Sequence, residues 1–317
     1  MRVLLWHVHG SWTTAFVQGG HDYLVPVLPD RGPDGRGRAR TWDWPASVTE
    51  VTAEEAAATP VDVVVLQRPH ELGHLAEVWL GGRRPGRDVP AVYVEHNAPQ
   101  GRIGEMRHVA ADRPDLLVAH VTHFNALFWD CGTTPATVVE HGVIDPGYRY
   151  TGELPHSAVV INEARRRGRV TGTDLLERLE AAAPIDLFGM DAANVPARVC
   201  AMDDVPQARL HDELARRRVY LHPIRWTSLG LSLIEAMHLG MPVVALATTE
   251  APDAIPPAAG IVSTRVERLG EAVREFMSEP ELARETGRAA RAAALERYGL
   301  ERFLGRWDEV LEEVANR

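Results

Sequence analysis

The chain has 317 residues, 45% of them apolar and 25% charged, so its length and composition favour a globular protein of two domains. Its formal net charge is −10 and acidic residues outnumber basic ones in both halves, which argues against nucleic acid as a partner. All 34 basic residues are arginine. The absence of lysine excludes Schiff-base chemistry and the lysine-containing phosphate-binding loop. Any anion must therefore be bound by arginine side chains or by backbone N–H groups.

The first half of the chain alternates short apolar segments with polar or helical ones. Strands are predicted for the apolar, β-branched segments at 3–8, 23–28, 61–67, 91–96, 116–121 and 136–143. Helical spacing of apolar residues predicts helices at 70–80 and 123–130, and turn-forming residues at 29–45 predict a surface loop. The continuous apolar character of several strands is typical of buried parallel strands.

The second half repeats this pattern. Strands are predicted at 157–162, 185–190, 197–202, 218–223, 241–246 and 260–264. Helices are predicted at 172–182, 206–216, 229–239, 264–278 and 280–317, the last with one break near Tyr298–Gly299. The stretch His141–Tyr150 combines glycine and proline after a strand, and it is the predicted boundary between the two halves.

Strands and helices that alternate in two successive series predict an α/β protein with two doubly wound sheets. In open sheets of this kind, ligands bind beyond the carboxyl ends of the strands. For two such domains, the expected binding site is a cleft between them.

The most informative segment runs from residue 222 to residue 245. A strand is followed by a glycine-containing loop, a predicted helix, and a second strand that begins at Met241-Pro242. The loop places backbone amides at a helix N-terminus, where the helix dipole favours a phosphate, and Glu235 lies one to two turns into the helix. A carboxylate there can accept hydrogen bonds from ribose hydroxyls. The alternative is an ordinary strand–helix–strand unit with an exposed Glu235.

The sequence SLGLSLIEAMHLGMPVVA (228–245) resembles the donor motif of GT-B glycosyltransferases of the family 4-like group. EHGVID (140–145) and TGTDLLERLEAA (171–182) resemble two further segments of that family in the same order. The resemblance implies two Rossmann-like domains that face each other across a cleft, with C-terminal helices crossing back to the first domain. It assigns 1–147 to the acceptor side, 148–299 to the nucleotide sugar, and 300–317 to the returning helix.

The resemblance also implies roles for individual residues. The amide-lined loop near the diphosphate and sugar corresponds to Ser228, Leu229, Gly230 and Leu231. Glu235 corresponds to the glutamate that binds the ribose, whereas Thr227 occupies the position of a glutamate that holds the transferred sugar in the family. This departure affects donor specificity and leaves open whether the anomeric configuration is retained or inverted.

A second departure concerns the charge on the diphosphate. The lysine of the family pattern corresponds to Thr171, so the nearby arginines, Arg169 first and then Arg165, are expected to bind the phosphates. Arg169→Ala should therefore raise the Michaelis constant for the donor. The alternative is that this run of arginines forms a solvated basic turn.

In the first half, two segments that follow predicted strands are candidates for the site. Gly10 and Ser11 lie in a predicted loop after the first strand, where the family contacts donor phosphates or acceptor. His96 ends a later strand and resembles the family's histidine that faces the sugar, where it could hydrogen-bond the sugar or move a proton. The alternative for His96 is a structural histidine.

No metal site and no cofactor is expected. The His7/His9 and His120/His123 pairs have no accompanying zinc motif, and the resembling enzymes need no metal for the diphosphate. The predicted donor is a UDP-, GDP- or dTDP-linked sugar, which is a substrate.

The predicted function is therefore transfer of a hexose-type sugar from a nucleotide sugar, with retention, to a small-molecule or glycan acceptor that is soluble. The alternatives are a catalytically degenerate GT-B protein that binds nucleotide sugar or glycan, and a GT-B nucleotide-sugar epimerase. No apolar stretch of 18 residues occurs, so stable membrane insertion is not expected and a cytoplasmic location is predicted.

Overall fold

A computed structural model describes residues 1–192, 199–203 and 205–317. The chain forms two compact units. The N-terminal unit comprises Met1–Gly142 and Leu300–Arg317, and the C-terminal unit comprises Val143–Gly299. The boundary between the two units at Gly142–Val143 therefore lies a few residues before residue 147, the expected end of the N-terminal domain.

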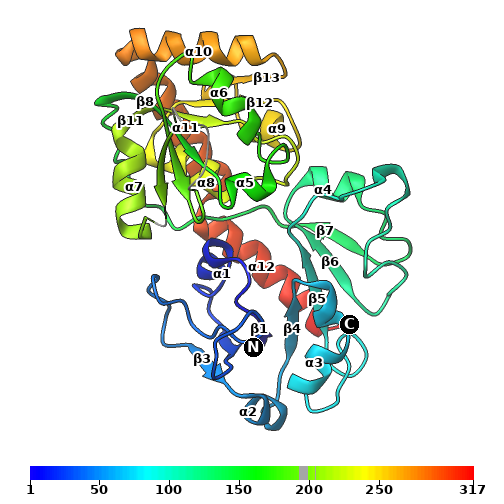
Figure 1. Ribbon diagram of the computed structural model, residues 1–317. Helices are drawn as coiled ribbons and strands as arrows, with labels where there is room; N and C mark the ends of the chain where they lie inside the picture. Colours follow the sequence, from blue (N-terminus) through cyan, green and yellow to red (C-terminus); the bar gives the residue numbers. More distant parts are fainter. Residues whose placement is uncertain (193–198, 204) are drawn as a thin grey trace. The chain divides into compact units, whose positions relative to one another are not determined.

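A parallel sheet forms the centre of the N-terminal unit (Figure 1). Its strands are β1 (Arg2–Leu5), β2 (Asp22–Pro26), β3 (Val48–Val51), β4 (Val63–Leu66), β5 (Ala91–Glu95), β6 (Leu117–His120) and β7 (Ala136–Val138). They lie in the order β3-β2-β1-β4-β5-β6-β7, and Val3 of β1 pairs with Tyr23 on one side and Val63 on the other. The chain winds outward from β1 in both directions, which confirms a doubly wound sheet.

The helices of the N-terminal unit differ in part from the prediction. They are α1 (Gly10–Phe16), α2 (Ala53–Ala58), α3 (His74–Trp79), α4 (His123–Phe128) and α12 (Leu300–Ala315), with 3₁₀ turns η1 (Pro69–Leu72) and η2 (Ile103–Glu105). The elements that were not predicted from the sequence are β3, α1, α2 and the 3₁₀ turn η2. Helix α2 has a local signal, because Thr52 and Glu55 form a capping box at its start. The predicted loop at Gly10 is wrong, since α1 begins at this residue.

Helix α12 packs against α1, β4 and β5 within the N-terminal unit. Trp307 lies edge-on to Trp12 and Phe16, with ring centroids 5.6 and 5.1 Å apart, and all three side chains are almost completely buried. Figure 1 shows α12, in red, beside these strands. This arrangement confirms the prediction that the C-terminal helix returns to the N-terminal domain.

A second parallel sheet forms the C-terminal unit. Its strands are β8 (Leu154–Val160), β9 (Ile185–Gly189), β10 (Cys200–Asp203), β11 (Arg217–His222), β12 (Val243–Leu246) and β13 (Gly260–Ser263), in the order β10-β9-β8-β11-β12-β13. Of the strand predicted at 197–202, residues 197 and 198 lie outside the described residues. Successive side chains enter different cores, Ala158 and Tyr220 on one face and Val159 and Leu221 on the other. Both faces of this sheet are therefore covered, as predicted.

Helices cover both faces of the second sheet. They are α5 (Ala164–Arg167), α6 (Leu176–Leu179), α7 (Gln207–Arg216), α8 (Leu231–Leu239), α9 (Ala251–Ala254), α10 (Val266–Ser278) and α11 (Pro280–Tyr298), with the 3₁₀ turn η3 (Thr173–Leu175). Helices α8 and α11 pack together, and α6 and α10 contribute to the other core. The predicted break near Tyr298–Gly299 is confirmed, because α11 ends at Tyr298 and α12 begins at Leu300.

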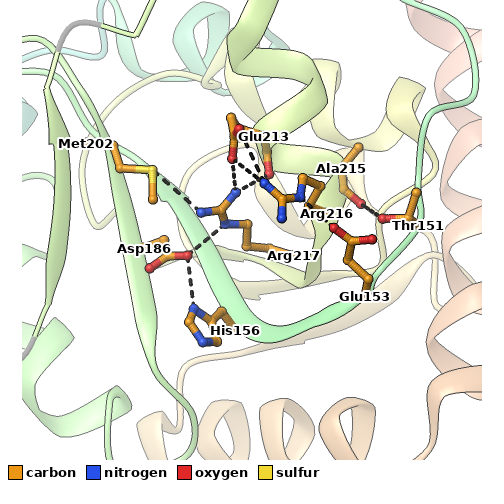
Figure 2. A network of polar contacts seen from close by, with 9 residues as sticks. All are labelled: Thr151, Glu153, His156, Asp186, Met202, Glu213, Ala215, Arg216 and Arg217. Atoms are coloured by element: carbon orange, nitrogen blue, oxygen red, sulfur yellow. Dashed lines mark hydrogen bonds and ion pairs between the residues drawn. The ribbon is translucent and has the colours of Figure 1, made fainter.

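A buried ion network lies at the amino ends of β8, β9 and β11 (Figure 2). Nε of Arg217 donates to Oδ2 of Asp186 at 2.7 Å, and its Nη1 donates to Oε2 of Glu213 at 2.6 Å. His156 Nδ1 lies 3.0 Å from the same Asp186 oxygen. The side chains of Arg217 and Asp186 are each only 4% exposed. Since the network occupies the edge of the sheet opposite the carboxyl ends, we assign it to stability.

Candidate functional site

The predicted site residues of the C-terminal unit lie on two segments, each made of a loop and a helix, that follow neighbouring strands at one edge of the sheet. Strands β8 and β11 are parallel neighbours, so the loops after them leave the sheet at the same edge. The amides of Arg225 and Trp226 both donate to the carbonyl of Val170, at 3.0 and 3.1 Å. Gly172 has a φ of +75°, and a Cβ there would lie 1.9 Å from the Pro223 carbonyl oxygen. The close approach of the two loops therefore requires glycine at this position.

The loop after β11 leads into α8 as the motif predicted. Helix α8 begins at Leu231, with Gly230 as its N-cap residue, while Ser228 and Leu229 are buried before it. The hydroxyl of Thr249 donates to the Ser228 carbonyl at 2.9 Å, which fixes the path of the loop. The first amides of a helix have no partner within the helix, and the dipole adds positive potential there. The turn around Gly230 can therefore bind a phosphate oxygen.

Glu235 is buried within α8, so the expectation that it is exposed in an ordinary strand–helix–strand unit is wrong. Its Oε2 lies 3.5 Å from Nε2 of His211 on the neighbouring helix α7, and Nε2 of Gln207 lies 3.0 Å from the same histidine nitrogen. Thr227, at the start of the loop, is partly buried. His211 was not predicted as a site residue, and its only sequence signal is its place on the helix before β11.

The arginines after β8 differ in their surroundings. Arg165 is exposed. Arg169 is also exposed and lies 3.2 Å from Asp174, whose carboxylate also accepts hydrogen bonds from both Nη1 and Nη2 of Arg225. The expected basic turn is partly helical, because residues 164–167 form α5.

Arg167 was not among the arginines favoured from the sequence, but its surroundings favour an anion. Its side chain is half-buried, and none of the described residues accepts a hydrogen bond from its guanidinium. Burial, together with the neighbouring Arg166, lowers the pKa of Arg167 below its ordinary value. The carboxylate of Glu163 acts in the opposite direction but does not cancel this effect. A partly desolvated cation without a hydrogen-bonded carboxylate gains from binding an anionic ligand.

In the N-terminal unit, His96 lies directly after β5. Its Nε2 is 3.0 Å from Oε1 of Gln67, which follows β4, and its ring lies 4.1 Å from that of His9, which follows β1. Burial lowers the pKa of His96 well below its ordinary value, and the neighbouring His9 and His141 act in the same direction. His96 is therefore a neutral imidazole at physiological pH.

Gln67 and His9 were missed as partners of His96, although both lie where predicted strands end. Polar residues that follow buried parallel strands meet at one edge of the sheet, and this was the available signal. Gly10 is the first residue of α1, and a Cβ there would make only ordinary contacts, so the backbone does not require glycine at this position.

The residues that the structure describes contain no group of three or more His, Cys, Asp and Glu side chains that could hold a metal ion. His120 instead lies with its Nε2 3.5 Å from the Cys131 sulfur. None of the described helices is long and apolar enough to cross a membrane.

Comparison with known proteins gives one match to a family model and several solved structures of similar fold. Residues 189–293 match the family model "Glycosyl transferases group 1". No curated protein matches the chain in sequence. Sucrose-phosphate synthase from Thermosynechococcus elongatus is 13% identical, with 99% of each chain covered and a TM-score of 0.75.

Two further solved structures have the same extent of similarity. Anabaena Alr3699/HepE, in complex with UDP-glucose, is 14% identical over 99% of this chain and 100% of that chain, with a TM-score of 0.72. AviGT4, a glycosyltransferase involved in avilamycin A biosynthesis, is 14% identical over 100% and 98%, with a TM-score of 0.66. At these identities the likeness shows the fold, and the family match covers the segment that contains α8. The similarity to the group 1 glycosyltransferase model thus lies in residues 189–293, and the chain as a whole has the GT-B fold.

Proposed function

We propose that the protein transfers a hexose-type sugar, with retention of configuration, from a nucleotide-sugar donor to a soluble small molecule or glycan. The observation that carries the proposal is the edge of the second sheet, where the N-terminus of α8 and its buried Glu235 follow β11, and the half-buried Arg167 of α5 follows the neighbouring strand β8. An amide-lined turn, a carboxylate and an arginine are complementary to a diphosphate and a ribose. The UDP-glucose bound by the Anabaena protein supports a donor of this class.

Transfer of the sugar requires the protein to stabilise the departing nucleoside diphosphate. As the bond from the sugar to the phosphate breaks, negative charge grows on the phosphate oxygens. The amides of the turn at Gly230 and Leu231 donate to one side of this group, and an arginine side chain compensates the remaining charge. Arg167 fits this role best, and Arg165 and Arg169 stay candidates.

The remaining candidates contact other parts of the substrate. Glu235 accepts hydrogen bonds from the ribose hydroxyls, and Thr227 offers one hydroxyl to the sugar in place of the carboxylate that the family uses. Gly10 lies at the start of α1 as a candidate for the donor phosphates. In the N-terminal unit, His96 hydrogen-bonds the transferred sugar.

The acceptor attacks the sugar from the side of the departing phosphate, as the family resemblance implies. This route requires no nucleophile from the protein. It also requires no metal, because the helix dipole and an arginine compensate the diphosphate.

The test is a screen of UDP-, GDP- and dTDP-linked sugars by thermal shift and by release of nucleoside diphosphate. A transferase should be stabilised by one nucleotide and should hydrolyse its sugar donor slowly without acceptor. Glu235→Gln should weaken binding, whereas Glu177→Gln, on the exposed side of α6, should leave it unchanged. Stabilisation without turnover would indicate the degenerate binding protein, and interconversion of donor sugars would indicate the epimerase. No thermal shift with any nucleotide sugar would refute the proposal.

A further inference from the structure

The carboxamide of Gln67 links the backbone of β1 to the ring of His96. Gln67 is buried, its Nε2 donates to the Trp6 carbonyl at 2.8 Å, and its Oε1 lies 3.0 Å from His96 Nε2. A carbonyl oxygen can only accept, so the amide nitrogen must face Trp6. The orientation of the amide is therefore fixed, and its oxygen faces the histidine.

This orientation decides which nitrogen of His96 carries the proton. Since Oε1 of Gln67 can only accept, Nε2 of His96 must donate. A neutral imidazole has one N–H, so Nδ1 is left with a lone pair. The groups that face the ring, His9 at 4.1 Å and His141 at 6.4 Å between centroids, disfavour a second proton.

The lone pair on Nδ1 is available to a ligand. His96 retains some exposure to solvent, and no described residue hydrogen-bonds its Nδ1. Trp12 stands edge-on to the ring at 5.1 Å and holds its plane from another side. The ring is thus oriented by its neighbours and has one nitrogen available for hydrogen bonding.

We propose that Gln67 is a positioning residue that fixes Nδ1 of His96 as a hydrogen-bond acceptor. This acceptor selects a sugar that bears a hydroxyl where it faces Nδ1 over a sugar that bears a carboxylate there. A hydroxyl can donate to Nδ1, whereas a carboxylate has only acceptors and would meet a lone pair. The choice between a neutral hexose and a uronic acid therefore depends on a residue that does not itself touch the sugar. The selection step rests on the proposed function, but the tautomer does not.

The first test is the tautomer of His96 in the unliganded full-length protein. ¹⁵N chemical shifts of labelled histidine, assigned with His96→Gln, should show Nε2 protonated and Nδ1 unprotonated. In Gln67→Met, which has a similar volume but no amide, the signal should move toward a mixture of tautomers. Gln18→Met is the matched control, because it removes the hydrogen bond from Gln18 to the Thr14 carbonyl on α1 and should leave the His96 signal unchanged. A protonated Nδ1 in the wild type would overturn the inference.

The second test compares UDP-glucose with UDP-glucuronate by calorimetry and by donor hydrolysis. The wild type should prefer UDP-glucose by more than about tenfold, and Gln67→Met should reduce this preference to about threefold while UDP itself binds as before. Equal binding of the two sugars by the wild type would refute the selection. If the wild type binds no nucleotide sugar, the proposed function fails, and the ¹⁵N shifts still decide the role of Gln67.

Discussion

Replacement of Arg167 by alanine tests how the protein compensates the charge of a diphosphate without lysine. The side chain is half-buried, and its pKa is lowered by burial and by the adjacent Arg166. Hydrogen bonds to a charged group contribute about 1.5–3 kcal/mol, and the partial exposure of this side chain favours the lower part of that range. A loss of about 2 kcal/mol corresponds to binding that is about thirtyfold weaker.

The assay is calorimetric titration of the nucleoside diphosphate that the wild type binds. The neighbouring arginines provide matched controls with the same change of charge. Arg169→Ala removes an exposed side chain that pairs with Asp174, and Arg165→Ala removes an exposed one, so each should weaken binding less than about fivefold. Because the three residues lie on one short segment, general electrostatic attraction should change similarly in all three variants.

Two results would refute this reasoning. If Arg167→Ala bound the diphosphate within about twofold of the wild type, its desolvated charge would have no role in binding. If Arg169→Ala lost the most affinity, the expectation from the family spacing would be correct, and the Arg169–Asp174 pair would have to open on binding. Thermal unfolding of each variant without nucleotide should show that the C-terminal unit is intact.

Three further predictions concern stability. Arg217→Ala should destabilise the C-terminal unit by about 3–5 kcal/mol in urea denaturation, because it leaves Asp186 buried without its arginine. The control Arg216→Ala, which removes a side chain that is 43% exposed, should cost less than about 1 kcal/mol. Equal effects of the two substitutions would contradict the assignment of this network to stability. Trp307→Ala should destabilise the N-terminal unit by about 3–5 kcal/mol while nucleotide binding by the C-terminal unit persists, and the exposed Arg302→Ala should have little effect on calorimetric unfolding. Burial lowers the pKa of both His120 and His222 to about 4, so the unfolded chain binds more protons than the folded chain between pH 6.5 and 4. The free energy of unfolding should therefore fall as the pH falls through this range. A urea midpoint that is the same at pH 7 and pH 5 would exclude this contribution of the two histidines.

Patterns within a single segment were predictable, and contacts between distant segments were not. The buried strands and α8 follow from apolar runs and from the 228–245 motif. Helix α1 was missed because Gly10 and Ser11 are typical of a loop, and its stability comes from the burial of Trp12 and Phe16 against α12, nearly 300 residues away. Likewise, the link from Gln67 to Trp6 spans 61 residues, which spacing along one strand cannot reveal.

Among the neighbouring arginines, too, the sequence predicts the character of the segment but not which side chain is buried. A run of four arginines around Gly168 predicts a positive segment, but successive residues of a short helix point about 100° apart. Which of them is partly buried depends on how the segment packs on the sheet. Sequence spacing therefore identified the segment correctly as basic, while the selection of Arg167 requires the burial of each side chain.

Because the chain has no lysine, the diphosphate must be bound by an arginine that is not already held by a carboxylate. Arginine forms strong ion pairs with carboxylates, and several arginines of the C-terminal unit are engaged in this way: Arg166 with Glu163, Arg217 with Asp186, and Arg225 with Asp174. An arginine held by a carboxylate must give up that pair to bind a phosphate, and a fully exposed one must give up water, so neither gains much. Arg167 has lost part of its water, and the nearby Glu163 carboxylate offsets this only in part, so a diphosphate would give this side chain a direct anionic partner.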